Sequence, residues 1–295
     1  MIKRAIYISS PLVLKLKSNQ MILRTKDEPD IVKSIPIEDI GYVIFEEQQS
    51  SITLPLLNAL SNNNVAVIFC NDVRMPNAML LNLNSNSIQG ERYKNQLSAS
   101  GPLKKNLWKQ IIESKIRNQA ALLDKLGKDG SKLRYQYSNV KSGDTDNREG
   151  IAAKIYWNEL FGENFIRNRD GSPPNSLLNY GYTILRAAVT RALMGSGLFP
   201  AFGIFHKNRY NAFPLTDDIM EPYRPYVDEI VFQLYDSGKT YLDKETKVEL
   251  LRVLFIDTQF STVMRPLDIA LTMTSASLAK CFAGTQKKIS YPLLN

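Results

Sequence analysis

The chain has 295 residues, which is enough for roughly two domains, each with a core of its own. It carries 37 Lys and Arg residues against 29 Asp and Glu residues, a formal net charge of +8, which favours a polyanionic partner without specifying one. The two cysteines, Cys70 and Cys281, are too few for a disulfide scaffold or a cysteine-based zinc site. No apolar stretch reaches the ~18 residues of a membrane span, and the N-terminus lacks the apolar segment of a signal peptide, so we expect a cytoplasmic protein with no membrane partner.

The first part of the chain is predicted to be rich in strands, because short apolar runs alternate with turn residues. The expected strands are residues 4–9, 12–17, 21–25, 35–37, 41–46 and 65–70. Residues 17–20 predict a hairpin turn, and one helix is expected near residues 55–61. We place this domain at residues 1–82 and a linker at residues 83–90, where four Asn or Ser residues are adjacent.

From residue 91 onward the spacing of the apolar residues becomes helical. Helices are predicted at residues 102–126, 147–161, 175–194, 244–256 and 261–283. A further helix is expected to begin at Thr216, and the polar stretch 127–146 is expected to be a flexible loop. The sequence therefore predicts an α+β fold, in which a small N-terminal β-rich domain precedes a larger all-helical domain at residues 91–295.

The first candidate for chemistry is His206, the only histidine, which lies in a polar and basic loop. An imidazole can bind a metal ion or transfer protons near neutral pH, but a lone histidine also suits a structural or surface role. Further along, Asp218 and Glu221 are three residues apart and share one face of a helical turn. Two such carboxylates repel each other unless a cation or solvent intervenes, so they predict a metal site if they face inward and a solvated helix start if they face outward.

Glu149 is the third candidate, in the first turn of the helix predicted at residues 147–161. An acidic residue there complements the helix dipole, and it becomes a candidate metal ligand only if it faces a cleft. Carboxylate oxygens combined with one imidazole suit Mg²⁺ or Mn²⁺ better than a structural zinc, and these ions imply phosphate chemistry. The chain has no phosphate-binding loop, no nucleophile elbow and no pair of cysteines two residues apart.

Basic and aromatic residues near these candidates in sequence could bind a DNA backbone. The residues that we single out are Arg186, Lys207, Arg209, Arg224 and Tyr180. Arg186 lies on a helix with many apolar residues, so pairing with a core carboxylate is an equal alternative for it.

Four motifs follow one another along the helical part of the chain. They are Asp146-x-Arg148-Glu149-Gly150-x-Ala152-Ala153 with Tyr156-Trp157, Leu177-Leu178-Asn179-Tyr180-Gly181-Tyr182, Gly197-Leu198-x-Pro200-x-x-Gly203-x-x-His206, and Asp218-x-Met220-Glu221-Pro222-x-Arg224-Pro225-x-Val227-Asp228. Their order and spacing resemble the CRISPR-associated protein one family, the spacer-acquisition integrases, and most of all its type II variants. The β-rich first part of the chain agrees with this family, so the resemblance covers essentially the whole chain.

The resemblance implies that Glu149, His206 and Glu221 are the catalytic residues and the ligands of Mg²⁺ or Mn²⁺, with Asp218 as an accessory acid. It implies a homodimer formed largely through the N-terminal domain. The implied partner is CRISPR-associated protein two, in an assembly of two dimers of this chain around one partner dimer.

The implied reaction belongs to antiviral defence and uses double-stranded DNA as both substrates. The 3′-hydroxyl ends of a protospacer attack phosphates of the CRISPR repeat in a transesterification. Two alternatives stay open at this point: a structure-selective DNA endonuclease with water as the nucleophile, and a non-catalytic DNA-binding scaffold.

Overall fold

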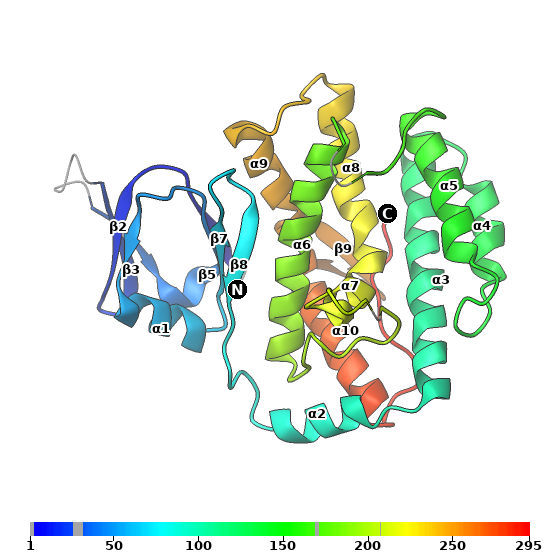
Figure 1. Cartoon of the computed structure of the whole chain (residues 1–295), viewed down its shortest axis with the longest axis horizontal. Helices are drawn as coiled ribbons and strands as arrows, with labels where there is room; N and C mark the ends of the chain where they lie inside the picture. Colours follow the sequence, from blue (N-terminus) through cyan, green and yellow to red (C-terminus); the bar gives the residue numbers. More distant parts are fainter. Residues whose placement is uncertain (1–2, 26–31, 169–170, 207) are drawn as a thin grey trace. The chain divides into compact units, whose positions relative to one another are not determined.

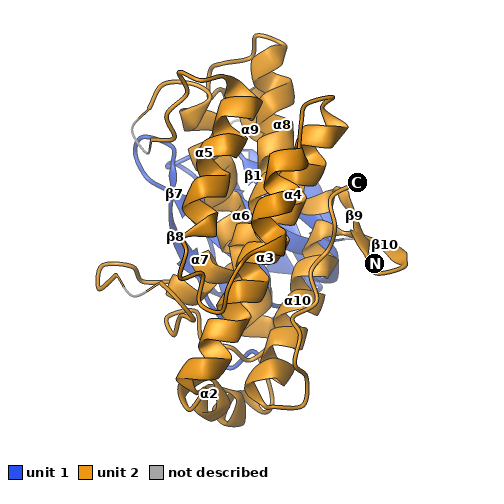
Figure 2. Ribbon diagram, turned by 90° about the vertical axis from the view of Figure 1, so that its right-hand side faces the viewer, with its two compact units in different colours: residues 1–85 blue, residues 86–295 orange. Residues whose placement is uncertain are grey.

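The computed structural model describes residues 3–25, 32–168, 171–206 and 208–295. It divides the chain into two compact units, residues 1–85 and 86–295, coloured separately in Figure 2. The predicted fold class is confirmed, because a β-rich unit precedes a larger, mostly helical one. Among the described residues, none of the helices combines the length and the hydropathy that a membrane crossing requires.

Two four-stranded sheets and one helix form the first unit. One sheet has the strand order β1-β5-β7-β8, in which β1 (Arg4–Ile8), β5 (Ile40–Phe45) and β7 (Ala66–Cys70) are parallel and β8 (Pro76–Leu80) is antiparallel. The other has the order β4-β3-β2-β6, with β4 (Val32–Pro36), β3 (Gln20–Thr25), β2 (Leu12–Lys17) and β6 (Ser51–Ile52). A short 3₁₀ turn, η1 (Ile37–Asp39), precedes β5, and helix α1 (Leu54–Asn62) follows β6.

One hydrophobic core joins the two sheets and α1. It includes Ile8 of β1, Leu14 of β2, Val43 of β5 and Leu56 of α1. Alternate residues of β2 and β3 point into this core, as expected for strands with one solvated face. The predicted turn at residues 17–20 is confirmed, because Ser18 and Asn19 adopt the positive φ angles that a tight hairpin requires.

The second unit consists of nine described helices with two 3₁₀ turns and one hairpin. The helices are α2 (Gln89–Leu97), α3 (Gly101–Lys125), α4 (Ser131–Ser138), α5 (Arg148–Phe161), α6 (Asn175–Gly195), α7 (Pro214–Met220), α8 (Arg224–Asp236), α9 (Lys244–Leu251) and α10 (Leu267–Phe282). The 3₁₀ turns are η2 (Glu221–Tyr223) and η3 (Arg252–Phe255), and the hairpin is β9 (Asp257–Phe260) with β10 (Val263–Pro266).

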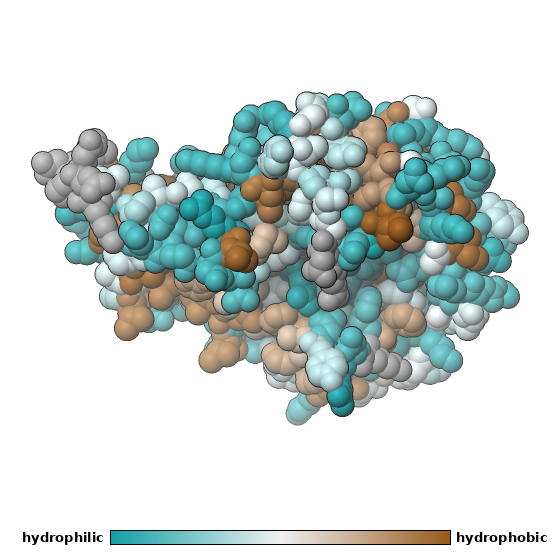
Figure 3. Space-filling view, turned by 45° about the horizontal axis from the view of Figure 1, so that its top comes forward, coloured by the Kyte–Doolittle hydropathy of each residue, from teal (hydrophilic) through white to brown (hydrophobic). Residues whose placement is uncertain are grey.

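Helix α6 is the centre of this unit and is buried along most of its length. It packs against α7, α8, α9 and α10, while α3 packs against α4, α5, α8 and η2 (Figure 1). The face of the molecule drawn in Figure 3 is mostly hydrophilic, with separate clusters of hydrophobic residues. The apolar side chains of α6 and α3 are mostly buried, and they are used for packing within the unit.

Three details of the sequence prediction are wrong. The stretch 127–146 contains helix α4, which is short and buries only Leu133 and Gln136, too little to give a helical pattern. The helix predicted at residues 261–283 begins only at Leu267, because Ser261 has a positive φ and starts the turn of the β9–β10 hairpin. Thr216 does not begin a helix: α7 begins two residues earlier, and the buried hydroxyl of Thr216 pairs with that of Thr190.

The start and end of α5 agree with the prediction, and they place Glu149. The side chain of Asn147 accepts a hydrogen bond from the backbone N–H of Gly150 and caps the helix. Gly162 ends the helix with a φ of +96°, which a residue with a side chain rarely adopts. Glu149 therefore lies in the first helical turn, anchored by local interactions.

Gly181 sets the distance between α6 and α8. A Cβ atom added there would lie 2.5 Å from Cγ1 of Val227 on α8, closer than two carbon atoms can approach. The two helices are therefore in contact at a point where only a hydrogen atom fits. This contact supports the segment from Glu221 to Asp228, because that segment leads into α8.

We expect Gly181→Ala to destabilise the protein by about 1–3 kcal/mol, because the added methyl group forces α6 and α8 apart. Gly90→Ala is the matched control, since Gly90 lies in α2 with open space where its Cβ would be. This control should be neutral or stabilising. Denaturant unfolding of both variants measures the difference, and an equal effect of the two changes would contradict the close contact.

Candidate active site

Helix α3 carries a row of buried side chains that contact every part of the site. Trp108, Lys115 and Asn118 are seven and then three residues apart, so they lie on one face of the helix. The ring of Trp108 stacks on Phe205 of the loop that bears His206, with 4.1 Å between the ring centroids. The amide of Asn118 donates a hydrogen bond of 2.8 Å to the carbonyl oxygen of Pro222. Lys115, between these two, contacts the acidic residues.

The ammonium of Lys115 lies between Glu149 and Glu221. Its Nζ atom is 2.6 Å from Oε1 of Glu149 and 2.6 Å from Oε2 of Glu221. The guanidinium of Arg224 contacts the other oxygen of Glu221, with both Nε and Nη2 at 2.9 Å. Glu221 is only 4% exposed and Asp218 is fully buried, so this acidic pair faces inward and is not a solvated helix start.

The charges around Glu221 keep it ionised in spite of its burial. Burial raises the pKa of Glu221, but the positive charges of Arg224 and Lys115 outweigh this effect and lower the pKa to about 2. Burial lowers the pKa of Lys115, and the carboxylates of Glu221 and Glu149 more than reverse this shift. At neutral pH both carboxylates therefore face a positively charged lysine.

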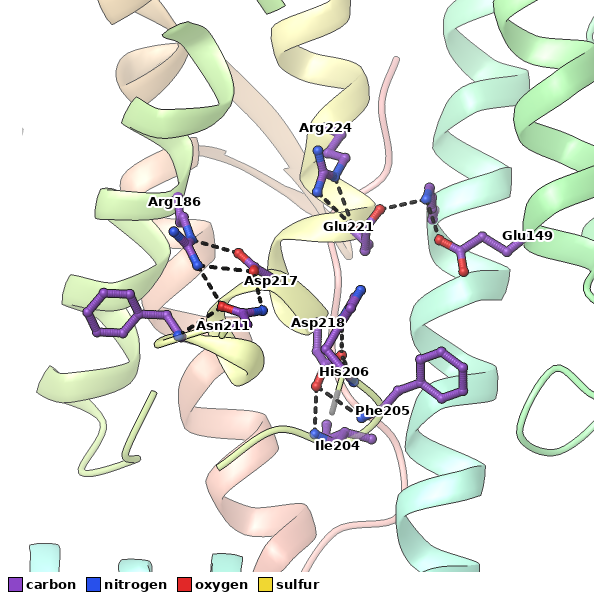
Figure 4. Close-up of polar contacts among 12 residues, drawn as sticks. Glu149, Arg186, Ile204, Phe205, His206, Asn211, Asp217, Asp218, Glu221 and Arg224 are labelled. Atoms are coloured by element: carbon purple, nitrogen blue, oxygen red, sulfur yellow. Dashed lines mark hydrogen bonds and ion pairs between the residues drawn. The ribbon is translucent and has the colours of Figure 1, made fainter. Parts of the chain in front are cut away.

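Asp218 holds the loop that carries His206. Its Oδ2 atom accepts backbone hydrogen bonds from Ile204 and Phe205 at 2.6 and 3.1 Å, and its Oδ1 atom accepts one from His206 at 3.2 Å (Figure 4). The Nδ1 atom of the His206 ring lies 2.6 Å from Oδ1 and donates to it. Because all four contacts are to Asp218, this acid acts here as a positioning residue for the loop.

The contact with Asp218 also fixes the orientation of the His206 ring. With Nδ1 donating to a carboxylate, the neutral ring presents the lone pair of Nε2 to a ligand, as metal-binding histidines do. The hydrogen bond that the His206 ring donates to Asp218 raises the pKa of His206, and burial opposes this shift only partly. A metal ion that binds Nε2 must therefore displace a proton that is held more tightly than on an ordinary histidine.

The described residues include no group of three acidic, histidine or cysteine side chains close enough to hold one metal ion together. The structure brings Glu149 and Glu221 to one point, while the His206 ring contacts Asp218. The donors nevertheless fit a hard divalent cation. Oε2 of Glu221 is buried and lies 2.6 Å from the ammonium of Lys115, so this carboxylate oxygen already faces a cation, as a ligand of a divalent ion would.

The residues predicted to contact DNA differ in whether their side chains already pair with acidic residues of the protein. Arg186 donates to both carboxylate oxygens of Asp217, and Arg224 contacts Glu221, so both are engaged within the protein. Arg209 lies over the exposed ring of Tyr210 on the loop after His206. Lys207 lies outside the described residues.

The structure contradicts a DNA contact by Tyr180. This side chain is fully buried in α6, with the ammonium of Lys247 5.6 Å from the centre of its ring. A fully buried ring offers no surface to a DNA backbone. The motif that contains Tyr180 is therefore a packing element of the core.

The model of the family described as CRISPR associated protein Cas1 matches residues 6–265 of the chain. The chain belongs to this family. It is 40% identical over 255 residues to a CRISPR-associated endonuclease Cas1 of Neisseria meningitidis serogroup C, covering 85% of this chain and 83% of the relative. A second relative, CRISPR-associated endonuclease Cas1 1 of Francisella tularensis subsp. novicida, is 27% identical over 264 residues, covering 81% and 82% of the two chains.

Solved structures share the fold at low sequence identity. A casposase bound to its integration product has a TM-score of 0.79 and 20% identity, covering 98% of this chain and 93% of its own. A Cas1 protein from Thermotoga maritima has a TM-score of 0.75 and 21% identity, covering 97% and 99%. A complex described as Cas6-RT-Cas1–Cas2 has a TM-score of 0.72 and 20% identity, covering 99% of this chain and 36% of the other. The Cas1 fold therefore extends over both units.

Lys115 is the residue of this Cas1 site that the sequence motifs miss. It lies 34 residues before Glu149 and 106 before Glu221, in a helix that contains none of the motifs. The sequence contains one signal that could have identified Lys115. In the apolar stripe of the predicted helix, Lys115 stands next to Ile116 and follows Ile112 by three residues, so it is a charge on the buried face.

The role of a second residue, Asp228, becomes clear only in the structure. It is buried and accepts hydrogen bonds from the hydroxyl groups of Tyr156 on α5 and Tyr182 on α6. Burial raises the pKa of Asp228 to about 6, although the hydrogen bonds from the tyrosines oppose this shift. Three of the four sequence motifs therefore meet at this carboxyl group, which holds α5 in place and with it Glu149.

We expect Asp218→Asn to lower the pKa of His206, because burial then acts on the ring without the carboxylate that raises it. The chain has one histidine, so its ring proton signal can be followed by NMR through a pH titration of the metal-free protein. Asp217→Asn is the control, since Asp217 pairs with Arg186 and should affect the His206 pKa much less. An unchanged pKa in Asp218→Asn would contradict the contact.

The same variant should change how stability depends on pH. The contact between protonated His206 and the carboxylate of Asp218 stabilises the folded protein. This stability is complete below the ordinary imidazole pKa and is lost as the pH rises through the raised pKa of His206. In Asp218→Asn this extra stability at low pH should be lost, together with about 2–3 kcal/mol of stability from the backbone hydrogen bonds to the buried carboxylate.

Proposed function

We propose that this Cas1 protein is the metal-dependent DNA integrase of CRISPR adaptation. It joins the 3′-hydroxyl ends of a protospacer to the CRISPR repeat by transesterification. The observation that carries the proposal is the meeting of Glu149 and the buried Glu221 at one cation, near an imidazole that presents Nε2. The names of the relatives as endonucleases and the likeness to a casposase bound to an integration product support it.

The residues that would hold Mg²⁺ or Mn²⁺ are Glu149, His206 and Glu221. When bound, such an ion polarises the scissile phosphate and stabilises negative charge on the leaving 3′ oxygen. Glu221 enters this role already ionised, because Arg224 neutralises its second oxygen. Asp218 keeps the His206 ring oriented through Nδ1, which leaves Nε2 as the nitrogen that would bind the ion.

Double-stranded DNA is the proposed substrate on both sides of the reaction, as protospacer and as repeat. Arg209, next to exposed Tyr210, is the best placed of the described candidates for a DNA contact, and Lys207 precedes it by two residues in the sequence. Arg224 and Arg186 contribute positive charge from the protein side of the site. The net charge of +8 favours this polyanionic substrate at long range.

The proposed assembly contains a homodimer of this chain formed largely through residues 1–82. Two such dimers would flank one dimer of Cas2, which is the partner named in a complex that shares the fold. Residues 91–295 form the catalytic domain in this proposal, since they carry all three proposed ligands.

Glu149→Ala, His206→Ala and Glu221→Ala should each abolish integration, because each removes a ligand from the ion. The assay follows labelled duplex DNA into a supercoiled plasmid that bears a repeat, with Cas2 and Mg²⁺ or Mn²⁺ present. Glu229→Gln is the matched control, since this acid of α8 pairs with Lys125 away from the site. Full activity in any of the three alanine variants would remove that residue from the ligand set.

The products of the same assay separate integration from the alternatives. Cut plasmid without joined label identifies an endonuclease that uses water as the nucleophile. DNA binding that survives chelation and Glu221→Ala, with no cut or joined product under any metal, identifies a scaffold.

Integration should also fall as the pH is lowered, and the fall should begin above the ordinary imidazole pKa of about 6.5. The reason is that Asp218 raises the pKa of His206, and the ring must lose its proton at Nε2 to bind a metal ion. The profile is measured at subsaturating Mn²⁺, where proton and metal compete. A rate that stays constant to well below pH 6 would remove His206 from the ligand set.

A further inference from the structure

Lys115 occupies the position between two carboxylates that a metal ion would be expected to occupy. It projects from the buried face of α3, and its side chain is 11% exposed. Its Nζ atom is equally close to Glu149 and Glu221, at 2.6 Å from each.

The two contacts of Lys115 are not equivalent. Its ammonium donates a hydrogen bond to Oε1 of Glu149. Its contact with Oε2 of Glu221 is an ion pair of 2.6 Å with a buried oxygen. The lysine is therefore the cation that balances the charge of this oxygen, and a divalent ion that binds there must displace the ammonium.

The site is accessible to a cation from solvent. The side chain of Glu149 is 26% exposed, whereas that of Glu221 is 5% exposed, so the position between them is reached from the Glu149 side. The four-carbon stem of a lysine has several rotatable bonds, and its ammonium can move while the backbone of α3 stays fixed. A divalent ion and an ammonium repel each other and cannot share one position.

We propose that Lys115 is a positioning residue that serves as the resident cation of the metal-free site, and that a divalent ion competes with its ammonium for Glu149 and Glu221. This inference rests on the proposed metal site and concerns how the site exists without its ion. In the metal-free protein the lysine keeps two repelling carboxylates together, so the ligands are already assembled when the ion arrives. The cost is weaker metal binding, because the ion must displace a favourable contact.

The test uses Lys115→Met, which keeps most of the length of the stem and removes the charge. Binding of Mn²⁺ to the purified full chain without DNA is measured by calorimetry or by the electron paramagnetic resonance of free Mn²⁺. We expect Lys115→Met to bind Mn²⁺ at least about tenfold more tightly than the unchanged protein, since no ammonium competes. Glu149→Gln should lose binding in both backgrounds.

Thermal unfolding gives a second readout that does not depend on activity. Without metal, Lys115→Met should unfold at a lower temperature than the unchanged protein, because the two carboxylates then repel each other. Saturating Mn²⁺ should remove this deficit, since the ion takes over the role of the lysine. Lys125→Met is the control: Lys125 lies on the same helix, pairs with Glu229 at 2.8 Å, and should leave the Mn²⁺ affinity unchanged.

Equal or weaker Mn²⁺ binding by Lys115→Met, with binding still lost in Glu149→Gln, would overturn the role of Lys115 and leave the metal site standing. Absence of Mn²⁺ binding in both the unchanged protein and Lys115→Met would overturn the metal site and this inference together. Lys115→Gln guards against a variant that does not fold, because its amide can still hydrogen-bond to Glu149, and it should show the same gain in affinity.

Discussion

The ionised carboxylate of Glu221 is the feature on which the rest of the site depends. A charge with so little exposure to water would cost several kcal/mol if it were isolated, and it would take up a proton instead. Two cations prevent this: Arg224 from the start of α8 and Lys115 from α3. Lys115 also contacts Glu149 of α5. The ion pairs of this one lysine therefore join α3 to both α5 and η2.

Two other buried acids hold the elements that carry the proposed ligands. Asp218 gathers the backbone of the loop around His206, and Asp228 joins α5 and α6 to α8 through two tyrosine hydroxyl groups. The acids of the motifs therefore divide into two kinds. Glu149 and Glu221 present oxygens to the site, whereas Asp218 and Asp228 use theirs inside the protein. This division gives the site its rigidity, because each ligand is held by a second residue.

Local signals account for most of what the sequence predicts. Asn147 and Gly162 mark the ends of α5 because capping acts within a few residues, and the β-rich first unit follows from alternating apolar residues. Helix α4 and the β9–β10 hairpin are missed because both are short: α4 buries only two side chains, and each strand of the hairpin has four residues. Lys115 is missed for a different reason. Its partners are 34 and 106 residues away, and only the packing of α3 against α5 and η2 brings them together.

The charge balance of the site also bears on how DNA and metal would act together. In the metal-free protein the negative charges of Glu149 and Glu221 are matched by Lys115 and Arg224. A divalent ion added to this balanced group leaves an excess of positive charge at a partly buried place, and a DNA phosphate is the natural anion to offset it. Metal and phosphate would then strengthen each other's binding by the same factor, as thermodynamic linkage requires. The net charge of +8 attracts DNA to the protein as a whole, but salt screens that attraction, and it cannot supply this local coupling.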